Sequence, residues 1–280
     1  MAQPTFSIEF FPPKTPEGVE NLRGERNRLA EIGATYYSVT LGAGGSARYG
    51  NNDTVTEIQK EGREAAPHLL CIGSKCDDVR TRLHEYKAQG IRHLVALRGD
   101  LPEGEERAQG EFHYANELVE FIRRETGDWF KIDVAAYPEM HPQAVSPQAD
   151  LANFVRKANA GADSAITQYF YNADAYFRFV DEARKAGVTI PIVPGIMPIT
   201  NHTQLARFSQ MCGAEIPRWV RLRLESYGED LESIREFGLD VVTQLCQRLL
   251  AGGAPGFHFY SLNRAAPTVA IWQRLFSAGK

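Results

Sequence analysis

The stretch KIDVAAYPEMHPQAVSPQADLANFVRKANAGADSAITQYFY, residues 131–171, contains one complete strand–helix–strand unit. Its two ends are short runs of β-branched, aromatic and other apolar residues, a pattern typical of strands. Between them Ser146 can cap a helix, Pro147 suits the first helical position and Gly161 suits the exit. The sequence therefore predicts a helix over 147–160 between two strands.

Similar apolar runs recur along the whole chain. They predict eight strands, at residues 6–11, 36–41, 68–73, 93–99, 131–138, 164–171, 190–197 and 256–262. Helical segments separate them, with further helices expected near 202–212 and 229–251. Near-continuous apolar strands that alternate with helices are typical of a parallel sheet covered by helices. Eight such units close into an α/β fold, a (β/α)8 TIM-type barrel, and the length suits a single domain over residues 1–280.

The composition argues against several classes of protein. Lys and Arg total 31 against 35 Asp and Glu, a net charge of -4, and no basic run offers a grip on nucleic acid. The four cysteines lack CxxC spacing and the N-terminus lacks a signal-peptide pattern, which favours a reduced, cytoplasmic setting. No apolar run approaches the roughly 20 residues that span a bilayer, so no membrane is expected as a partner.

Glu9 is a carboxylate in the middle of the apolar run FSIEFF. Burying an unpaired charge is costly, so Glu9 must be paired, protonated or required for function. Polar residues end or follow nearly every predicted strand: Glu9, Thr40, His68, Cys71, Arg98, Asp100, Tyr137, His141, Gln168, Asn263 and Arg264. The carboxyl ends of barrel strands meet at the face that carries active sites, so this ring predicts a site there. Each residue alone could instead serve packing or a structural ion pair.

A glycine-rich loop after the second strand resembles a nucleotide-binding motif. In GAGGSA, Gly42, Gly44 and Ala47 match the dinucleotide fingerprint. The loop runs on before any helix begins, and Gly73 and Ser74 stand where a ribose-binding acid should follow the next strand. We therefore do not expect a Rossmann site.

The predicted helix over 147–160 also carries a polar face. Asp150, Asn153, Arg156 and Lys157 share that face at helical spacing. The periodicity fits a solvated outer surface, and it equally allows the phosphates or ribose of a cofactor to lie across the helix.

Six motifs, in order, give the chain a family resemblance. They are IEFFPPKT (8–15), HLVALRGDLP (93–102), VAAYPEMHP (134–142), AITQYF (165–170), VPGIMPITN (193–201) and FHFYSLNRA (257–265). Together they closely resemble the 5,10-methylenetetrahydrofolate reductases, essentially from end to end. That resemblance implies a (β/α)8 barrel with non-covalent FAD, which reduces methylenetetrahydrofolate to 5-methyltetrahydrofolate by ping-pong hydride transfer from NADH or NADPH. It also implies a cytoplasmic homo-oligomer in one-carbon metabolism and methionine supply, without a C-terminal regulatory domain.

The resemblance also assigns roles to particular residues. Glu9 would be the general acid that protonates the folate as its five-membered ring opens, with a pKa raised by burial beside aromatic residues. Asp100 would stabilise the cation that forms. The flavin would contact Thr40, Ala43, His68, Arg98, Gly99, Asp100, Tyr114, Ala115, Tyr137, His141, Ala144, Asp150, Asn153, Arg156 and Lys157. Folate and nicotinamide would contact Asp100, Gln168, Gln204, Phe208 and Arg264.

Departures from the family pattern leave alternatives open. Leu41 and Leu70 stand where relatives commonly have tyrosine and threonine, and Asn172 stands where an aspartate is common. These three positions put the choice of electron donor in question. The remaining alternatives are an enzyme working mainly on 5-methyltetrahydrofolate in the oxidative direction, a non-catalytic flavin- or folate-binding protein, and a metal-dependent aldolase or hydrolase. The resemblance implies no metal, and the sequence contains no compact HxH or HxxxH pair.

Overall fold

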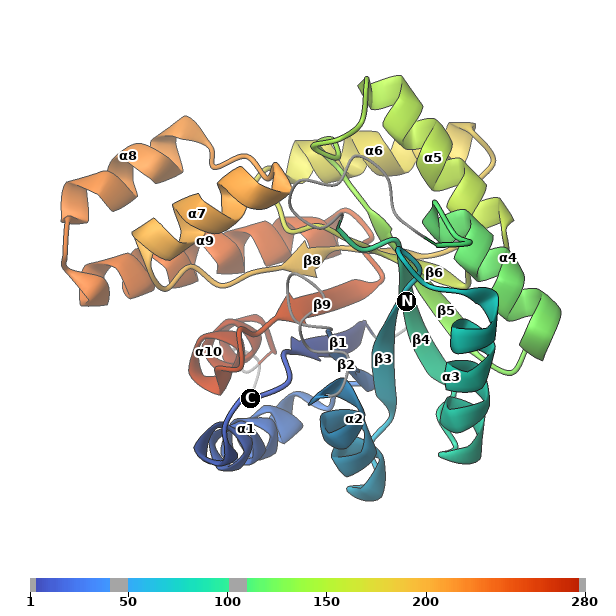
Figure 1. The fold of residues 1–280 in the computed structure, drawn as a ribbon. Helices are drawn as coiled ribbons and strands as arrows, with labels where there is room; N and C mark the ends of the chain where they lie inside the picture. Colours follow the sequence, from blue (N-terminus) through green and yellow to red (C-terminus); the bar gives the residue numbers. More distant parts are fainter. Residues whose placement is uncertain (1–3, 41–49, 101–109, 277–280) are drawn as a thin grey trace.

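The computed structural model describes residues 4–40, 50–100 and 110–276 (Figure 1). Its strands are β1 Thr5–Phe10, β2 Tyr36–Val39, β3 Ala65–Leu70, β4 His93–Leu97, β5 Lys131–Ala136, β6 Ser164–Thr167, β7 Ile192–Val193, β8 Gly195–Ile196 and β9 Gly256–Tyr260. Its helices are α1 Pro16–Leu29, η1 Ala30–Ile32, α2 Gly50–Lys60, α3 Cys76–Ala88, α4 Ala115–Thr126, α5 Pro147–Asn159, α6 Ala173–Lys185, α7 His202–Cys212, α8 Arg218–Tyr227, α9 Leu231–Ala251 and α10 Ala265–Phe276. The strands form one parallel sheet in the order β7-β6-β5-β4-β3-β2-β1-β9-β8.

The predicted strand over 190–197 is broken in two at Pro194. Its first half, β7, pairs with β6, while its second half, β8, pairs with β9. Proline has no N–H to donate to a ladder, but the Pro194 carbonyl still accepts from the backbone N–H of His258 at 3.0 Å. Because the two pieces belong to one segment, they bring the two edges of the sheet together. The predicted (β/α)8 barrel is confirmed, with a seventh strand in two pieces.

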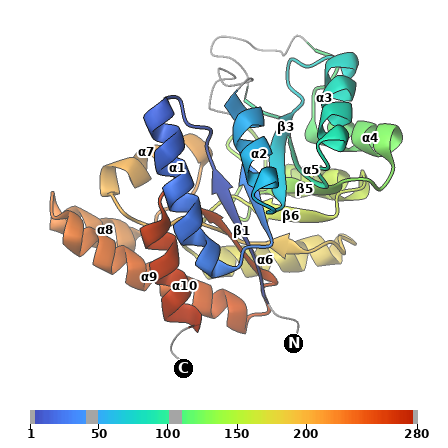
Figure 2. The same ribbon diagram turned by 90° about the horizontal axis from the view of Figure 1, so that it is seen from below.

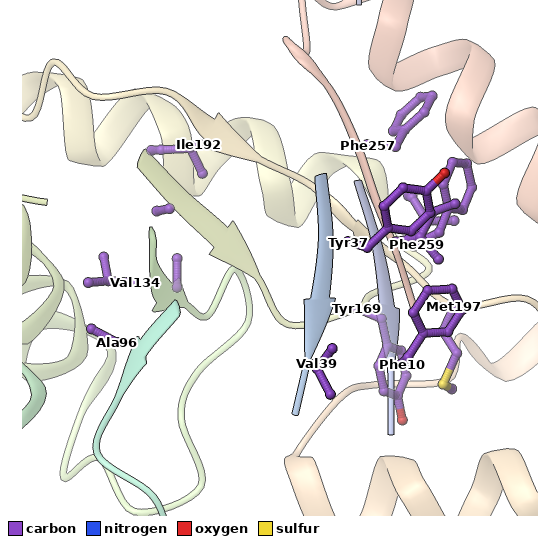
Figure 3. Close-up of a cluster of buried hydrophobic side chains, with 14 of the residues drawn as sticks. Phe10, Tyr37, Val39, Ala96, Val134, Tyr169, Ile192, Met197, Phe257 and Phe259 are labelled. Atoms are coloured by element: carbon purple, nitrogen blue, oxygen red, sulfur yellow. The ribbon is translucent and has the colours of Figure 1, made fainter. Parts of the chain in front are cut away.

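The main hydrophobic core lies between the strands and the helices that surround them. Figure 3 shows part of it, including Phe10, Tyr37 and Phe259 on the outward faces of β1, β2 and β9. Burying one such side chain stabilises the fold by about 1.5–3 kcal/mol relative to leaving it in water. The barrel interior holds a much smaller apolar cluster, which includes Tyr36 and Val95. Neighbouring residues on a strand face opposite sides, so Tyr36 points inward while Tyr37 stacks on Phe10 outside.

The helix predicted over 147–160 is confirmed as α5. The Ser146 hydroxyl accepts from the Ala149 N–H at 3.2 Å, and Pro147 occupies the first turn. Helices α7 and α9 match the two further predicted helices, but α8 was not expected. Only Val220 and Leu224 are buried along α8, so its sequence shows a weak apolar stripe. Helices α7, α8 and α9 project together from one side of the barrel (Figure 1).

Helix α10, near the C-terminus, lies beside the N-terminal elements α1 and β1. It packs against both α1 and α9 (Figure 2), and the Phe276 ring lies 5.3 Å from that of Phe6 on β1. In the described part of the chain, no helix combines the length and apolar character needed to cross a bilayer.

Candidate active site

Glu9 lies inside the barrel between two histidines. It follows Ser7 on the inner face of β1, and its side chain is 14% exposed. Its Oε2 atom is 3.4 Å from Nε2 of His68 on β3 and 3.6 Å from Nε2 of His258 on β9. Strand β3 begins at Ala65, three residues earlier than predicted, so His68 lies within the strand instead of at its first position. The earlier start explains why His68 reaches Glu9.

The pKa of Glu9 is lowered, contrary to the expectation from the sequence. Burial raises the pKa of this carboxyl, but the imidazoles of His258 and His68 together lower it by more. The prediction of a raised pKa was wrong because it considered only the aromatic neighbours along the strand. Burial lowers the pKa of His68 itself. In the protein without ligand, Glu9 therefore favours its carboxylate form.

Several polar atoms around Glu9 have no hydrogen-bond partner among residues 4–40, 50–100 and 110–276. Both ring nitrogens of His68, Nε2 of His258 and the hydroxyl of Ser38 are buried without one. We call Glu9, Ser38, His68 and His258 the mouth group. Buried polar atoms are nearly always satisfied in folded proteins, so these atoms mark a place where a ligand is expected to supply partners.

Like Ser38, the nearby residues Ser7, His258 and Tyr260 were not predicted from the sequence. Ser7 lies 2.7 Å from Nδ1 of His258, a contact that orients the ring. Tyr260 pairs with Glu9 across β1 and β9 and donates its hydroxyl to the Thr167 carbonyl at 2.8 Å. A signal did exist: Ser7 lies two residues before Glu9, and Tyr260 lies two after His258. Positions two apart share one face of a strand.

The second group of predicted residues gathers at the ends of β4 and β5 and in the loop before α5. Arg98 donates to the Gln143 side chain and, through Nε, to the Gly99 carbonyl at 3.1 Å. The ring of Tyr137 meets the ring of His141 edge to face, with 4.6 Å between their centres. Burial, then the charge of Asp100, raises the pKa of Tyr137 to about 12. In the described part of the chain, no ion pair joins Arg98 to Asp100.

Helix α5 faces this group with part of its polar side. Asp150 accepts from the backbone N–H of His141 at 2.8 Å, and the Lys157 ammonium donates to the Ala135 carbonyl at 2.5 Å. Burial lowers the pKa of Lys157 to about 8. Asn153 and Arg156 hydrogen-bond to each other and are exposed.

The residues of this group fit an anionic dinucleotide. Arg98, Arg156 and Lys157 offer positive charge, and the buried Lys157 forms no ion pair within the described part of the chain, which leaves it suited to receive a phosphate. Gly99 has φ +87°, and a Cβ there would lie 2.9 Å from the side chain of Ile72, so only glycine fits this close turn. The unsatisfied nitrogens of His68 add further donors or acceptors nearby. A flavin could therefore be held across the ends of β4 and β5 and the face of α5.

The other residues predicted to contact the flavin lie on three segments, and of these residues Ala144 joins the group directly, because its N–H donates to the His141 carbonyl at 2.9 Å. Thr40 follows β2 and is half-buried, and Ala144 lies in the loop before α5. Tyr114 and Ala115 lie at the start of α4, where Tyr114 is 61% exposed, and none of the contacts above reaches them. Ala43 falls outside the described residues, as do Leu41 and the glycine-rich loop.

The third group forms a pocket beside the mouth. Gln204 and Phe208 on α7 and Arg264 after β9 line it together with Phe11, although they are distant in sequence. The pocket encloses about 90 Å³. Pockets for drug-sized molecules usually enclose about 300–1,000 Å³, so this one suits one end of a larger ligand. Gln168 follows β6, half-buried, and its side-chain oxygen accepts from the Tyr169 N–H at 3.0 Å.

Two departures from the family pattern have local roles. The Asn172 side chain caps α6 by accepting from the Asp174 N–H at 3.0 Å. The side chain of Leu70 packs close to Gly99. Among the described residues, no group of three or more His, Cys, Asp or Glu side chains is placed to hold a metal ion.

The whole chain is similar to known reductases. Residues 1–276 match the family model for methylenetetrahydrofolate reductase. The 5,10-methylenetetrahydrofolate reductases of Salmonella typhimurium and Escherichia coli are 42% and 41% identical over 270 residues, which cover 96% of this chain and 90% of each relative. Methylenetetrahydrofolate reductase (NADH) 1 of Arabidopsis thaliana is 37% identical, over 98% of this chain and 48% of that relative.

Solved structures share the fold at much lower identity. A Clostridium thermocellum protein described as binding two copies of 5-methyl-5,6,7,8-tetrahydrofolic acid aligns with a TM-score of 0.67 and 16% identity, over 98% of this chain and 94% of its own. The C-terminal domain of a Desulfitobacterium hafniense chitinase aligns with a TM-score of 0.57 and 11% identity, over 98% of this chain and 100% of its own. At such identities the likeness concerns the barrel alone. The family model and the bacterial relatives decide the matter: the chain belongs to the methylenetetrahydrofolate reductase family of oxidoreductases.

Proposed function

We propose that this protein reduces 5,10-methylenetetrahydrofolate to 5-methyltetrahydrofolate, with electrons from NADH or NADPH that pass through a bound FAD. The observation that carries the proposal is Glu9, which lies between His68 and His258 and beside the pocket of Gln204, Phe208 and Arg264. Both ring nitrogens of His68 and Nε2 of His258 lack hydrogen-bond partners among the described residues. A proton donor at the base of an open site is what ring opening of the folate requires.

Glu9 would act as the proton donor once ligands fill the mouth. In the protein without ligand, its pKa is lowered by His258 and His68 against the effect of burial. A bound folate excludes water and strengthens the effect of burial, which favours the protonated carboxyl. The proton can come from Nε2 of His258, 3.6 Å away.

The other predicted residues would bind and orient the reactants. Phe208 offers a flat face for stacking and Arg264 a cation for a folate carboxylate. Asp100 lies at the end of β4, exposed, where its negative charge can stabilise a developing cation. Arg98, Asp150, Arg156 and Lys157 would hold the FAD. When bound, FAD supplies the hydride acceptor for the nicotinamide and the hydride donor for the folate.

Anaerobic stopped-flow absorbance of the flavin-loaded protein tests the proposal. We expect NADH or NADPH to bleach the flavin and methylenetetrahydrofolate to restore its colour. Bleaching by 5-methyltetrahydrofolate alone would instead indicate a role in the oxidative direction. A protein that binds no flavin would contradict the proposal.

One site that serves both reactants in turn predicts ping-pong kinetics. Double-reciprocal plots of rate against nicotinamide concentration, at several fixed folate concentrations, should give parallel lines. Clearly intersecting lines would mean that both reactants bind at once, which would overturn the shared site.

A further inference from the structure

The turn between β9 and α10, residues 261–264, has a backbone conformation that side chains seldom adopt. Leu262 and Asn263 have φ values of +52° and +56°, and within the described ranges they are the only non-glycine residues with positive φ. The Arg264 N–H donates to the Ser261 carbonyl at 2.9 Å, which closes the turn. Positive φ at both central positions suits Gly, Asn and Asp, so Leu262 in particular is strained. Strain of this kind persists where contacts hold it, and it is found most at functional sites.

Asn263 uses both ends of its side-chain amide on a single residue after β1. Its Oδ1 atom accepts from the Phe11 N–H at 2.9 Å, and its Nδ2 atom donates to the Phe11 carbonyl at 3.0 Å. Strand β1 ends at Phe10, and its pairing with β9 ends at Glu9 and Tyr260. The amide thus takes the place of a backbone partner just beyond the ladder. An ionised carboxylate there would offer acceptors alone.

A second side chain of the turn holds the residue that carries the proposed proton donor. The Ser261 hydroxyl donates to the Glu9 carbonyl at 2.7 Å. Together with the two hydrogen bonds of Asn263, this contact attaches the turn to Glu9 and to Phe11. All three bonds are made to the backbone, so they fix the path of the chain at the end of β1 and leave the Glu9 carboxyl free to act.

The pocket beside the mouth is lined by the same segments. Phe11 and three of the four residues of the turn belong to its lining, whereas Asn263 lies outside it. Asn263 therefore joins two parts of the pocket wall without lining the pocket itself. Ser261 lines the pocket while it holds the Glu9 carbonyl. A ligand in the pocket is thereby placed relative to the Glu9 side chain.

We propose that Asn263 is a positioning residue that holds the wall of the pocket to the end of β1, so that bound folate meets the proton of Glu9. The inference rests on the proposed function, in which Glu9 protonates the folate. Transfer of a proton requires hydrogen-bond reach, about 2.6–3.2 Å between heavy atoms. A reactant misplaced by about 1 Å can react about 10²-fold more slowly. Asn263 therefore acts on the rate of folate reduction, and its own side chain exchanges no proton.

The variant Asn263→Gly tests this role. It removes the amide, and glycine suits the left-handed backbone, so loss of the two hydrogen bonds is separated from added strain. Its control is Asp230→Ala, which removes another exposed side chain that accepts from backbone N–H groups, those of Glu232 and Ser233 at the start of α9. Anaerobic stopped-flow absorbance of the FAD-loaded proteins follows flavin reduction by the nicotinamide. It then follows flavin reoxidation at a series of methylenetetrahydrofolate concentrations, which gives a limiting rate constant and an apparent Kd separately.

A positioning role predicts that one of these quantities changes. In Asn263→Gly the limiting rate constant of reoxidation should fall about tenfold to a hundredfold, as expected for a misplaced reactant. The apparent Kd for the folate should stay within about threefold, because the groups that bind the folate remain. Flavin reduction should stay within about twofold, because hydride transfer from the nicotinamide takes no proton from Glu9. Asp230→Ala should match the wild type in all three measurements.

Other outcomes would overturn the positioning role. A raised Kd with an unchanged limiting rate would show that Asn263 only shapes the pocket. Equal slowing of both half-reactions would show a general loss of structure. Should Asn263→Gly fail to fold, Asn263→Asp keeps the acceptor for the Phe11 N–H and loses the donor; a slower reoxidation alone is expected, and wild-type rates would overturn the role. Wild-type flavin that methylenetetrahydrofolate never reoxidises would overturn the proposed function, and the positioning role with it.

Discussion

At the floor of the barrel, where Tyr36, Asp133 and Ser164 meet His93, that histidine has a carboxylate beside each ring nitrogen. At the mouth, neither nitrogen of His68 has a hydrogen-bond partner in the part of the chain that the structure describes. Both rings are buried and both lie near an acidic residue. The floor raises the pKa of its histidine to about 9, while burial at the mouth lowers the pKa of His68. The two histidines differ in how many hydrogen-bond or ion-pair partners the protein supplies to their ring nitrogens.

Buried polar groups that have hydrogen-bond partners stabilise the barrel. Buried polar groups that lack such partners leave the barrel ready to bind a ligand that supplies them. An unsatisfied buried polar atom costs about 1–3 kcal/mol, so the mouth is a place where the fold gives up stability. Such a deficit is retained where the missing partners arrive with a substrate or cofactor. Changes at the floor should therefore alter stability, and changes at the mouth should alter chemistry.

The largest expected effect is at the centre of the mouth. Glu9→Gln keeps the shape of the side chain but cannot donate the carboxyl proton, so flavin reoxidation by methylenetetrahydrofolate should slow by about 10²–10⁴-fold. Reduction of the flavin by the nicotinamide should remain. Stopped-flow absorbance measures both steps, and Glu17→Gln on α1 is the exposed control. Loss of both steps would mean that Glu9 supports the structure instead.

The corresponding change at the floor is Asp133→Asn. It leaves the protonated His93 with Glu64 alone, and breaking a buried ion pair costs about 3–5 kcal/mol. Urea denaturation at pH 7 should report that loss of unfolding free energy, and Asp181→Asn on the surface of α6 should show none. A loss below about 1 kcal/mol, the range of exposed pairs, would contradict a structural pair at the floor.

The floor should also make wild-type stability depend on pH. The folded pKa of His93 is about 9, above its ordinary value of 6.5, so its contribution is fully present below pH 6.5 and is lost as the pH rises through 9. That shift corresponds to roughly 3 kcal/mol. Burial raises the pKa of Asp133, but His93 and its hydrogen bonds lower it to about 2, so the acid-side loss comes only at very low pH. Thermal melts from pH 6 to 9.5 measure the first effect, which Asp133→Asn should flatten.

A smaller effect is expected at the flavin side of the mouth. Lys157→Gln removes a cation whose pKa is lowered to about 8 by burial and would rise beside a diphosphate. A hydrogen bond to a charged group contributes about 1.5–3 kcal/mol, so FAD affinity should fall about tenfold to a hundredfold. Fluorescence titration of the apoprotein measures it, with Lys185→Gln on α6 as control. Unchanged affinity would remove Lys157 from the proposed flavin contacts.

The smallest expected effect is a difference in unfolding free energy between two serine variants, one at the floor and one at the mouth. Ser164→Ala removes a hydroxyl that donates to the Asp133 carboxylate and should cost about 1.5–3 kcal/mol of unfolding free energy. Ser38→Ala removes a buried hydroxyl that has no hydrogen-bond partner among the described residues, so it should be neutral or stabilising. Chemical denaturation of the two variants side by side checks the contrast. Equal costs would mean that the mouth and floor do not differ as described.

Much of this molecule could be predicted from sequence because its signals are local. Apolar runs located the strands, and Ser146 with Pro147 located the start of α5, since a cap needs only residues within one turn. The ring of polar residues at strand ends followed from the topology of a parallel barrel. The break of the seventh strand at Pro194 was also local, yet its effect on pairing depended on both neighbouring strands.

What the sequence by itself determined was the barrel, the family resemblance and the candidate residues. Only the tertiary structure decided which of them meet. Ser7 and His258 are 251 positions apart and Tyr36 and Asp133 are 97 apart, so no periodicity along the chain could have paired them. Separation along the sequence also explains why the pKa of Glu9 was wrongly expected to be raised. A pKa depends on the charges within a few ångströms in space, and those charges came from β3 and β9.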